Sequence, residues 1–289
     1  MTGERLGFVG LGRMGGPMAA RLVAAGYPLV GYDAAGTSER LPAGAVAAAS
    51  AEAVAAQADV VCLSLPDGAA SRAVCQQIVA APARRARTVV DLSTIGISAA
   101  RECAALLAAA GLTYVDAPVS GGVAGARSGS LAAMVGAPAA VYEGVQPLLG
   151  VVARNCFRVG DAAGQGQAMK LLNNYLSAAA LAATCEAVVF GARQGLDLAQ
   201  MIDVINVSSG RSAASSDKFP RSILPRTYDF GFAGAYMAKD VRLYLEAVEQ
   251  AGTPHALGAA VAQLWQRFHV AHPDADFTYL HHYLEAGGA

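Results

Sequence analysis

Short apolar runs alternate with longer segments of helical spacing over the first half of the chain. The apolar runs are four or five residues long and rich in β-branched side chains, which is typical of strands covered on both faces. The predicted strands are Leu6–Val9, Leu29–Tyr32, Val60–Ser64, Thr88–Asp91, Thr113–Asp116, Leu131–Val135 and Asn155–Val159. The helices predicted between them are Met14–Ala25, Ala51–Gln57, Ala69–Ala80, Ser98–Ala110 and one starting near Pro138. This alternation predicts an α/β fold with a parallel, doubly wound sheet.

The pattern changes after about Gly160, beyond which only helices are predicted. They are Gln167–Gln194, Leu198–Val207, Tyr236–Ala251 and Ala256–Ala271. Glycines cluster near the change, so we place a domain boundary there, with an α/β domain over 1–162 and an all-helical domain over 163–289. The apolar stretch Leu176–Ala192 is interrupted by Glu186 and has no flanking basic loop. A membrane span needs about 20 apolar residues, so we expect a soluble helix that is buried on most sides.

Composition narrows the class of protein. The chain has 289 residues, of which 54% are apolar, and its net charge is −1. A chain this apolar can fill a core, and without a basic block it is not expected to bind nucleic acid through phosphate contacts. Its five cysteines form no Cys-x-x-Cys pair, and Glu4 and Arg5 stand where a signal peptide would begin. We therefore expect a cytoplasmic protein with reduced, mostly buried thiols and no membrane partner.

A glycine-rich turn directly follows the first predicted strand. Gly10 permits the tight turn, Gly12 lets the backbone approach a pyrophosphate, and Gly15 lets the next helix pack closely. The start of that helix offers N–H groups and a positive dipole end to phosphates. The alternative is a glycine turn without a ligand. The predicted cofactor-binding residues of the turn are Gly10, Leu11, Gly12, Arg13, Met14 and Gly15.

Asp33 ends the second predicted strand, about 20 residues after the glycines, where a carboxylate accepts hydrogen bonds from the adenosine ribose. A carboxylate at this place repels a 2′-phosphate, and the next three residues, Ala34–Gly36, are not basic. The sequence therefore favours NAD over NADP and a Rossmann fold for the first domain. If NADP were preferred, Thr37, Ser38 and Arg40 would be the residues expected to hold the extra phosphate.

Three further segments carry polar groups that suit either chemistry or ordinary structure. Ser120–Gly122 follows a strand and offers a hydroxyl and backbone N–H groups to an anion, although alone it also suits an ordinary turn. Lys170 and Asn174 are four apart and so share one helix face. Partial desolvation would make this lysine usable as an acid or base, and the alternative is a helix lysine that reaches solvent. Lys239 and Asp240, read locally, form a surface ion pair.

The histidines give no metal-binding pattern. Neither His269 and His272 nor His281 and His282 has a cysteine or carboxylate at a ligand spacing. We expect solvated histidines and no metal.

Together these motifs resemble the β-hydroxyacid dehydrogenase family, which includes 3-hydroxyisobutyrate, tartronate semialdehyde and 6-phosphogluconate enzymes. The resemblance covers nearly the whole chain. Its four matching segments are Phe8–Ala19, Asp116–Gly122, Gly164–Asn174 and Met237–Asp240.

The resemblance implies roles at matching positions. Lys170 would be the catalytic lysine, and Lys239 would reach the cofactor or active site. The implied substrate-binding residues are Ser120, Gly121, Gly122, Asn174 and Arg211. The residues implied on the nicotinamide side of the cofactor are Leu65, Pro66 and Thr94. The sequence departs from the 3-hydroxyisobutyrate enzymes at Ser212–Ala214, where those enzymes carry a tryptophan.

We therefore expect a homodimer or homotetramer that transfers a hydride between NAD and a small 3-hydroxy carboxylic acid, with Lys170 as general acid and base and no metal. One alternative is an imine reductase of the same architecture, against which Lys170 argues. The other is a non-catalytic nucleotide-binding module, which should have lost this lysine or gained a targeting region.

Overall fold

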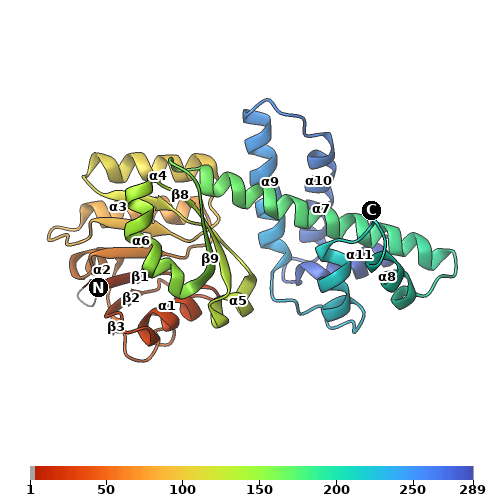
Figure 1. Cartoon of the computed structure of the whole chain (residues 1–289), viewed down its shortest axis with the longest axis horizontal. Coiled ribbons are helices and arrows are strands. Elements are labelled where there is room, and N and C mark those ends of the chain that lie inside the picture. Colours follow the sequence, from red (N-terminus) through yellow and green to blue (C-terminus); the bar gives the residue numbers. More distant parts are fainter. Residues whose placement is uncertain (1–3, 289) are drawn as a thin grey trace. The chain divides into compact units, whose positions relative to one another are not determined.

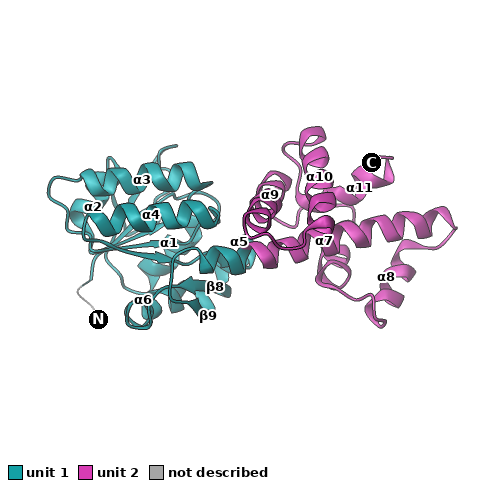
Figure 2. Cartoon of the chain, turned by 90° about the horizontal axis from the view of Figure 1, so that it is seen from above, with its two compact units in different colours: residues 1–170 teal, residues 171–289 magenta. Residues whose placement is uncertain are grey.

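The computed structural model describes residues 4–288 and divides the chain into two compact units, one ending at Lys170 and the other starting at Leu171 (Figure 2). The first unit is a nine-stranded sheet with helices on both faces (Figure 1). Its strands are β1 (Leu6–Val9), β2 (Leu29–Tyr32), β3 (Val46–Ala47), β4 (Val60–Leu63), β5 (Thr88–Asp91), β6 (Thr113–Asp116), β7 (Val119–Ser120), β8 (Leu131–Gly136) and β9 (Ala153–Gly160). Its helices are α1 (Gly15–Ala24), α2 (Ala51–Gln57), α3 (Gly68–Ala80), α4 (Ile97–Ala109), α5 (Gly122–Ser128) and α6 (Ala139–Val152).

The strand order is β3-β2-β1-β4-β5-β6-β8-β7, with β9 paired to β8. All pairs from β3 to β6 are parallel, with Leu6 opposite Leu29 on one side and Val60 on the other. Strand β8 runs antiparallel to β6 and β7. The predicted doubly wound α/β fold is thus confirmed. The order in which successive strands are added to the sheet reverses between β1 and β4.

Alternation along β1 gives the sheet two buried faces. Leu6 and Phe8 pack with Met18 of α1 in one core. Val9 packs with Val54 of α2 in the other. Side chains that alternate across a strand need apolar partners on both faces when helices cover both, which explains why these strands contain few polar residues.

The second unit is helical. Its helices are the remainder of α7 (Gln165–Arg193), α8 (Leu198–Asn206), the π-helix η1 (Ala214–Ile223), α9 (Gly234–Gln250), α10 (Ala256–Ala271), the short 3-10 helix η2 (Phe277–Tyr279) and α11 (Leu280–Glu285). Its core surrounds Trp265, Phe219 and Phe268. Beyond Gly160 the described residues contain no named strand, and Ala233 and Asp276 form an isolated bridge.

The division between the units falls inside helix α7, later than the predicted boundary at 162/163. Sequence pattern locates the end of the sheet at Gly160, but it does not reveal that the first turn of α7 is hydrogen-bonded to the first unit through Asp116.

The prediction that α7 is buried on most sides is wrong within the single chain. One face carries Ala178, Leu181 and Cys185 into the core of the second unit. On other faces Leu176 is 61% exposed and Phe190 is 66% exposed. Among the described residues, this helix is the one long and apolar enough to cross a membrane by length and composition, yet its buried face packs against other helices of the same unit.

Candidate functional site

The glycine turn after β1 has the geometry that a bound pyrophosphate requires. Gly10 has φ +91°, and a Cβ there would lie 2.3 Å from the carbonyl oxygen of Ser64. A Cβ on Gly15 would lie 1.8 Å from the carbonyl oxygen of Gly10, so only glycine permits this close approach of helix and strand. Gly12, in contrast, has no heavy atom within 4 Å of the position of a Cβ. The turn is closed where the protein packs and open where a ligand would approach.

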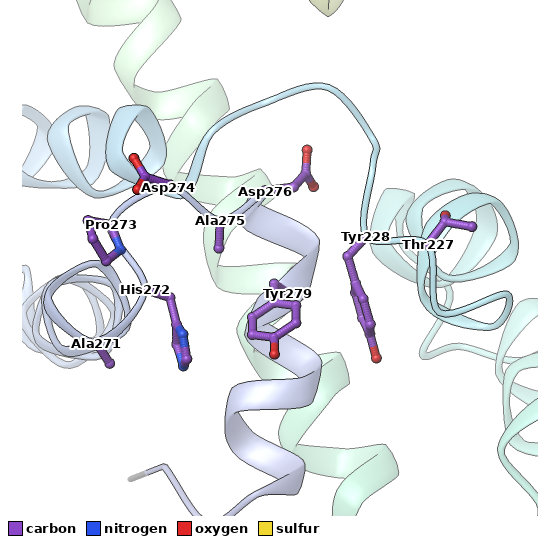
Figure 3. Close-up of a pocket in the computed structure, with 9 residues that line it drawn as sticks. All are labelled: Thr227, Tyr228, Ala271, His272, Pro273, Asp274, Ala275, Asp276 and Tyr279. Carbon is purple, nitrogen blue, oxygen red and sulfur yellow. The ribbon is translucent and has the colours of Figure 1, made fainter.

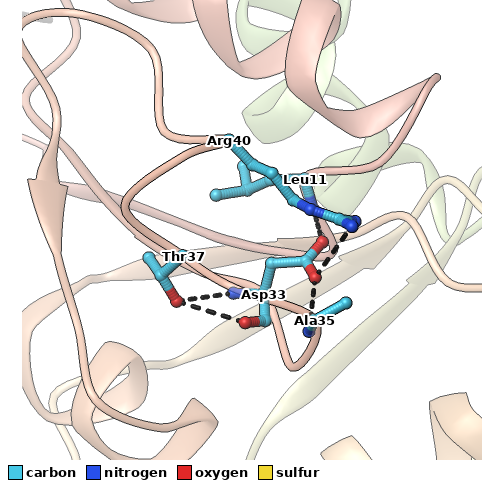
Figure 4. Close-up of polar contacts among 5 residues, drawn as sticks. All are labelled: Leu11, Asp33, Ala35, Thr37 and Arg40. Atoms are coloured by element: carbon cyan, nitrogen blue, oxygen red, sulfur yellow. Dashed lines mark hydrogen bonds and ion pairs between the residues drawn. The ribbon is translucent and has the colours of Figure 1, made fainter.

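Asp33 lies at the carboxyl end of β2, next to that turn (Figure 4). Its Oδ2 accepts a hydrogen bond of 2.7 Å from the backbone N–H of Leu11, and its Oδ1 accepts one of 2.8 Å from Ala35. The hydroxyl of Thr37 bonds both the N–H and the carbonyl of Asp33. These bonds fix the carboxylate beside the glycine turn, where a ribose diol can donate to it.

Sequence reasoning named Arg40 only as one of the residues that would hold a 2′-phosphate if NADP were preferred, and it did not predict a contact with Asp33. Arg40 Nη1 lies 3.4 Å from Asp33 Oδ1, and the arginine side chain is 41% exposed (Figure 4). Arg40 lies seven residues after Asp33. The turn that brings its side chain back to Asp33 is not predictable from the spacing alone. A partly exposed guanidinium is therefore in reach of any anion at this end of β2.

The segments that follow β4 and β5 are joined by Ser93. Its hydroxyl accepts a hydrogen bond of 2.8 Å from the N–H of Leu65, and its own N–H donates to Asp91 at 2.9 Å. Asp91 is completely buried, and this burial raises the pKa of its carboxyl. Leu65, Pro66 and Thr94 thus lie at the same carboxyl edge of the sheet as the glycine turn.

The segment Ser120–Gly122 is held at its start by the sheet. Ser120 pairs with Ala132 across β7 and β8. Gly121 has φ +129° and Gly122 has φ +63°, conformations that side chains of L-residues rarely adopt. Helix α5 then begins at Gly122, so the segment ends in a helix start that the predicted ordinary turn did not include.

Asp116 and Gln167 form a buried pair at the start of helix α7. Gln167 Nε2 donates to Asp116 Oδ1 at 2.8 Å, and the N–H groups of Gly164 and Gln167 donate to Asp116 Oδ2 at 2.8 and 3.1 Å. Burial raises the pKa of Asp116 to about 6, against the opposing effect of these donors. Lys170 follows one turn later and is only 7% exposed. The helix lysine is therefore buried and does not reach solvent freely, unlike the alternative of a helix lysine that extends into water.

In the second unit, Asp240 brings together Asn174 and Lys239. Asn174 Nδ2 donates to Asp240 Oδ2 at 2.6 Å, and Lys239 Nζ lies 3.1 Å from Asp240 Oδ1. The prediction of a surface ion pair is wrong, because Asp240 is 2% exposed. A buried carboxylate needs such partners. Asp240 is thus a candidate site residue that sequence reasoning read only as part of a local pair.

Arg211 is exposed, and its backbone N–H donates to the carbonyl oxygen of Ser208. Within residues 4–288 no three His, Cys, Asp or Glu side chains form a group that would hold a metal. The expectation of solvated histidines is wrong for His281, which is 3% exposed and packs edge-on against Phe219 with ring centroids 5.6 Å apart.

A hollow of about 480 Å³ lies on the second unit, where the rings of Tyr228, Tyr279 and His272 stand in a row (Figure 3). It contains none of the predicted site residues. Its lining residues are Thr227, Tyr228, Ala271, His272, Pro273, Asp274, Ala275, Asp276 and Tyr279.

Comparisons with known proteins cover both units. Residues 5–160 match the family model described as the NAD binding domain of 6-phosphogluconate dehydrogenase. Residues 164–284 match the model described as NAD-binding of NADP-dependent 3-hydroxyisobutyrate dehydrogenase. The chain is 38% identical to a probable 3-hydroxyisobutyrate dehydrogenase of Mycobacterium tuberculosis, over 97% of this chain and 98% of the relative. It is 36% identical to the 2-(hydroxymethyl)glutarate dehydrogenase of Eubacterium barkeri, over 91% and 88%.

Solved structures agree with this assignment. The 3-hydroxyisobutyrate dehydrogenase of Mycobacterium tuberculosis, solved with L-serine, superposes with a TM-score of 0.88 at 35% identity, over 97% of this chain and 99% of that one. An imine reductase of Streptomyces aurantiacus superposes with a TM-score of 0.65 at 23% identity, over 97% of this chain and 99% of that one, and shows a shared fold alone.

Proposed function

Since the chain belongs to the β-hydroxyacid dehydrogenase family, we propose that it transfers a hydride between NAD and a small 3-hydroxy carboxylic acid in the cytoplasm. The observation that carries the proposal is Lys170, a buried lysine on the helix whose first turn is anchored to the carboxyl end of β6. Neither an imine reductase nor a non-catalytic binding module needs a buried lysine at this position for proton transfer.

The residues present fit a nicotinamide dinucleotide. The open space at Gly12 leaves room for the pyrophosphate. No side chain caps the start of α1, so backbone N–H groups there are available to the phosphates. Asp33 would accept hydrogen bonds from the hydroxyls of the adenosine ribose. Leu65, Pro66 and Thr94 would line the site of the nicotinamide ring. The cofactor, when bound, supplies the hydride acceptor or donor at C4 of the nicotinamide.

Lys170 would move the proton. In oxidation, its neutral amine takes the proton of the substrate hydroxyl while the hydride leaves the same carbon, and in reduction its ammonium returns that proton. The ammonium form also stabilises a developing alkoxide. The carboxylate of Asp240 accepts one N–H of the Asn174 amide, and the amide oxygen accepts from Asn173 Nδ2 at 3.2 Å. The second N–H of the Asn174 amide would donate to the oxygen of the substrate hydroxyl, whose proton goes to Lys170.

The substrate carboxylate would bind the N–H groups of Ser120, Gly121 and Gly122, with Arg211 as a further cation. L-serine, present in the related Mycobacterium tuberculosis structure, is itself a 3-hydroxy carboxylic acid. This supports a 3-hydroxy acid as the class of substrate.

The exposed apolar face of α7 supports a homodimer or homotetramer. Leu172, Leu176 and Phe190 lie on it and are 39%, 61% and 66% exposed. A second copy of the chain is the partner that every molecule of the protein meets, and covering this face would remove apolar surface from water.

A turnover assay with NAD over a panel of small 3-hydroxy acids, 2-hydroxy acids and cyclic imines tests the proposal. We expect turnover of at least one 3-hydroxy acid and none of the imines. Turnover confined to imines would establish the imine reductase instead, and NAD binding without turnover of any compound would favour a binding module.

A further inference from the structure

The side chain of Gln167 uses its whole hydrogen-bonding capacity inside the first unit. Oε1 accepts from the N–H groups of Ile95 and Gly96 at 2.9 and 3.2 Å. Nε2 donates to the carbonyl oxygen of Ser93 at 3.1 Å and to Asp116 Oδ1 at 2.8 Å. An amide has two acceptor lone pairs and two donors, so all four are used. The residue is completely buried, and no group of the amide remains for a substrate.

These bonds join three segments that are far apart in the sequence. Ser93 to Gly96 follows β5 and includes Thr94, which is proposed to line the nicotinamide. Asp116 ends β6 and precedes Ser120. Gln167 itself belongs to the first turn of α7. One amide therefore ties the carboxyl ends of two adjacent strands to the helix that carries Lys170.

The backbone at the start of α7 also packs closely against the sheet. A Cβ on Gly166 would lie 2.5 Å from the carbonyl oxygen of Met134 and 2.9 Å from that of Asp116. Backbone and sheet edge are thus in direct contact. Since Lys170 lies three residues after Gln167, any shift or rotation of the first turn moves it directly.

We propose that Gln167 is a positioning residue that sets the place of Lys170 relative to the Thr94 segment. The inference rests on the proposed role of Lys170. Gln167 touches neither substrate nor cofactor; it acts through the placement of the lysine. A displacement of about 1 Å at a reacting group costs about 10²-fold in rate, so a buried, fully bonded amide one turn away is a sensitive point.

The first test replaces Gln167 by methionine, which has similar length and no amide. We expect kcat to fall about 10²-fold, while the dissociation constant for NAD changes less than about threefold, because the glycine turn and Asp33 are not altered. The matched control is Gln165→Met on the same helix turn. Gln165 is exposed and its amide accepts only from Ala162 in the described contacts, so we expect its kcat to stay within about threefold of the unmodified protein.

The second test exchanges amide and carboxylate. In Gln167→Glu, the second carboxylate oxygen faces the oxygens of Ser93 and Asp116, and kcat should fall as in the methionine variant. Adding Asp116→Asn gives a side chain whose Nδ2 can donate to the new carboxylate while its oxygen still accepts from Gly164. We expect the double variant to recover at least about tenfold of the lost kcat, a rescue that overall destabilisation does not produce.

Folded Gln167→Met or Gln167→Glu protein with unchanged kcat at saturating NAD and substrate would overturn the inference. If both single variants fail to fold, the folded double variant decides, and a kcat more than about tenfold below that of the unmodified protein also overturns the inference. Lys170→Ala, measured in parallel, separates the two proposals. Full turnover in Lys170→Ala refutes the proposed function, whereas loss there with normal kcat in the Gln167 variants refutes only the positioning role.

Discussion

At the scale of single residues, we expect the choice between NAD and NADP to depend on two side chains of opposite charge. Asp33 repels a 2′-phosphate, and Arg40, 3.4 Å from it, lowers that repulsion. We expect NAD to be preferred and NADP to be used weakly. Arg40→Ala should lower kcat/KM with NADP at least about tenfold, because one charge-assisted bond contributes about 1.5–3 kcal/mol, and should leave NAD nearly unchanged.

The ratio of kcat/KM for the two cofactors checks this prediction. Arg72→Ala serves as control, since Arg72 is an exposed arginine paired with Glu102. A preference for NADP in the unmodified protein would contradict the account of Asp33, and Thr37, Ser38 and Arg40 would then be the residues to examine as phosphate ligands.

The carboxylate of the substrate is the second prediction at this scale. If the N–H groups at Ser120–Gly122 bind it, a simple alcohol of the same size should have a kcat/KM lower by roughly 10- to 150-fold. This corresponds to the loss of a charge-assisted hydrogen bond that contributes about 1.5–3 kcal/mol. Steady-state rates with matched acid and alcohol pairs measure this. Equal rates would mean that the protein does not recognise the acid group.

At the scale of elements, helix α7 carries apolar residues on its buried face and also on an exposed face. We predict that Leu176→Glu shifts the protein from an oligomer to a monomer, because a charge would then be buried at the contact between copies. Sedimentation velocity gives the mass in solution. Phe157→Glu, at an apolar residue of β9 that is 56% exposed, is the control. A monomeric unmodified protein, or an oligomer unaffected by Leu176→Glu, would contradict the prediction.

Sequence pattern predicted β1, β2, β4, β5 and β6 and the long helices well, because their periodicity is strong and their ends coincide with glycines or polar residues. It missed β3 and β7, which have two residues each, the short helices α5 and α11, and the π-helix η1, whose spacing is not that of an α-helix. The glycine turn and Asp33 were readable because they are local. The buried contacts of Gln167 and Asp240 were not, since their partners are 51 to 74 and 66 residues away, and one sequence carries no signal for such pairs.

At the scale of the whole molecule, Asp116 links stability to pH. Its carboxyl has a pKa of about 6 in the folded chain and about 3.9 when unfolded, so the folded state binds the proton more tightly. Its contribution to the free energy of unfolding is therefore largest below pH 4 and is lost as pH rises through 6. The loss is about 3 kcal/mol at most. Asp91 and Tyr114 are buried nearby, and burial raises the pKa of each.

Denaturant unfolding of the unmodified protein and Asp116→Asn between pH 4.5 and 7.5 measures this contribution. The unmodified protein should lose stability relative to the variant as pH rises. Parallel curves would show that Asp116 does not change its protonation in this range.

The account as a whole depends on Lys170, and one measurement tests it most directly: kcat of Lys170→Ala with NAD and the best 3-hydroxy acid, together with the dissociation constant for NAD. We predict a fall in kcat of at least about 10²-fold, the low end for the loss of a general acid–base group, with NAD binding nearly unchanged. Lys170→Arg should fare little better, because a guanidinium does not give up its proton. Near-full turnover in Lys170→Ala would contradict the account and make Lys239 the next candidate.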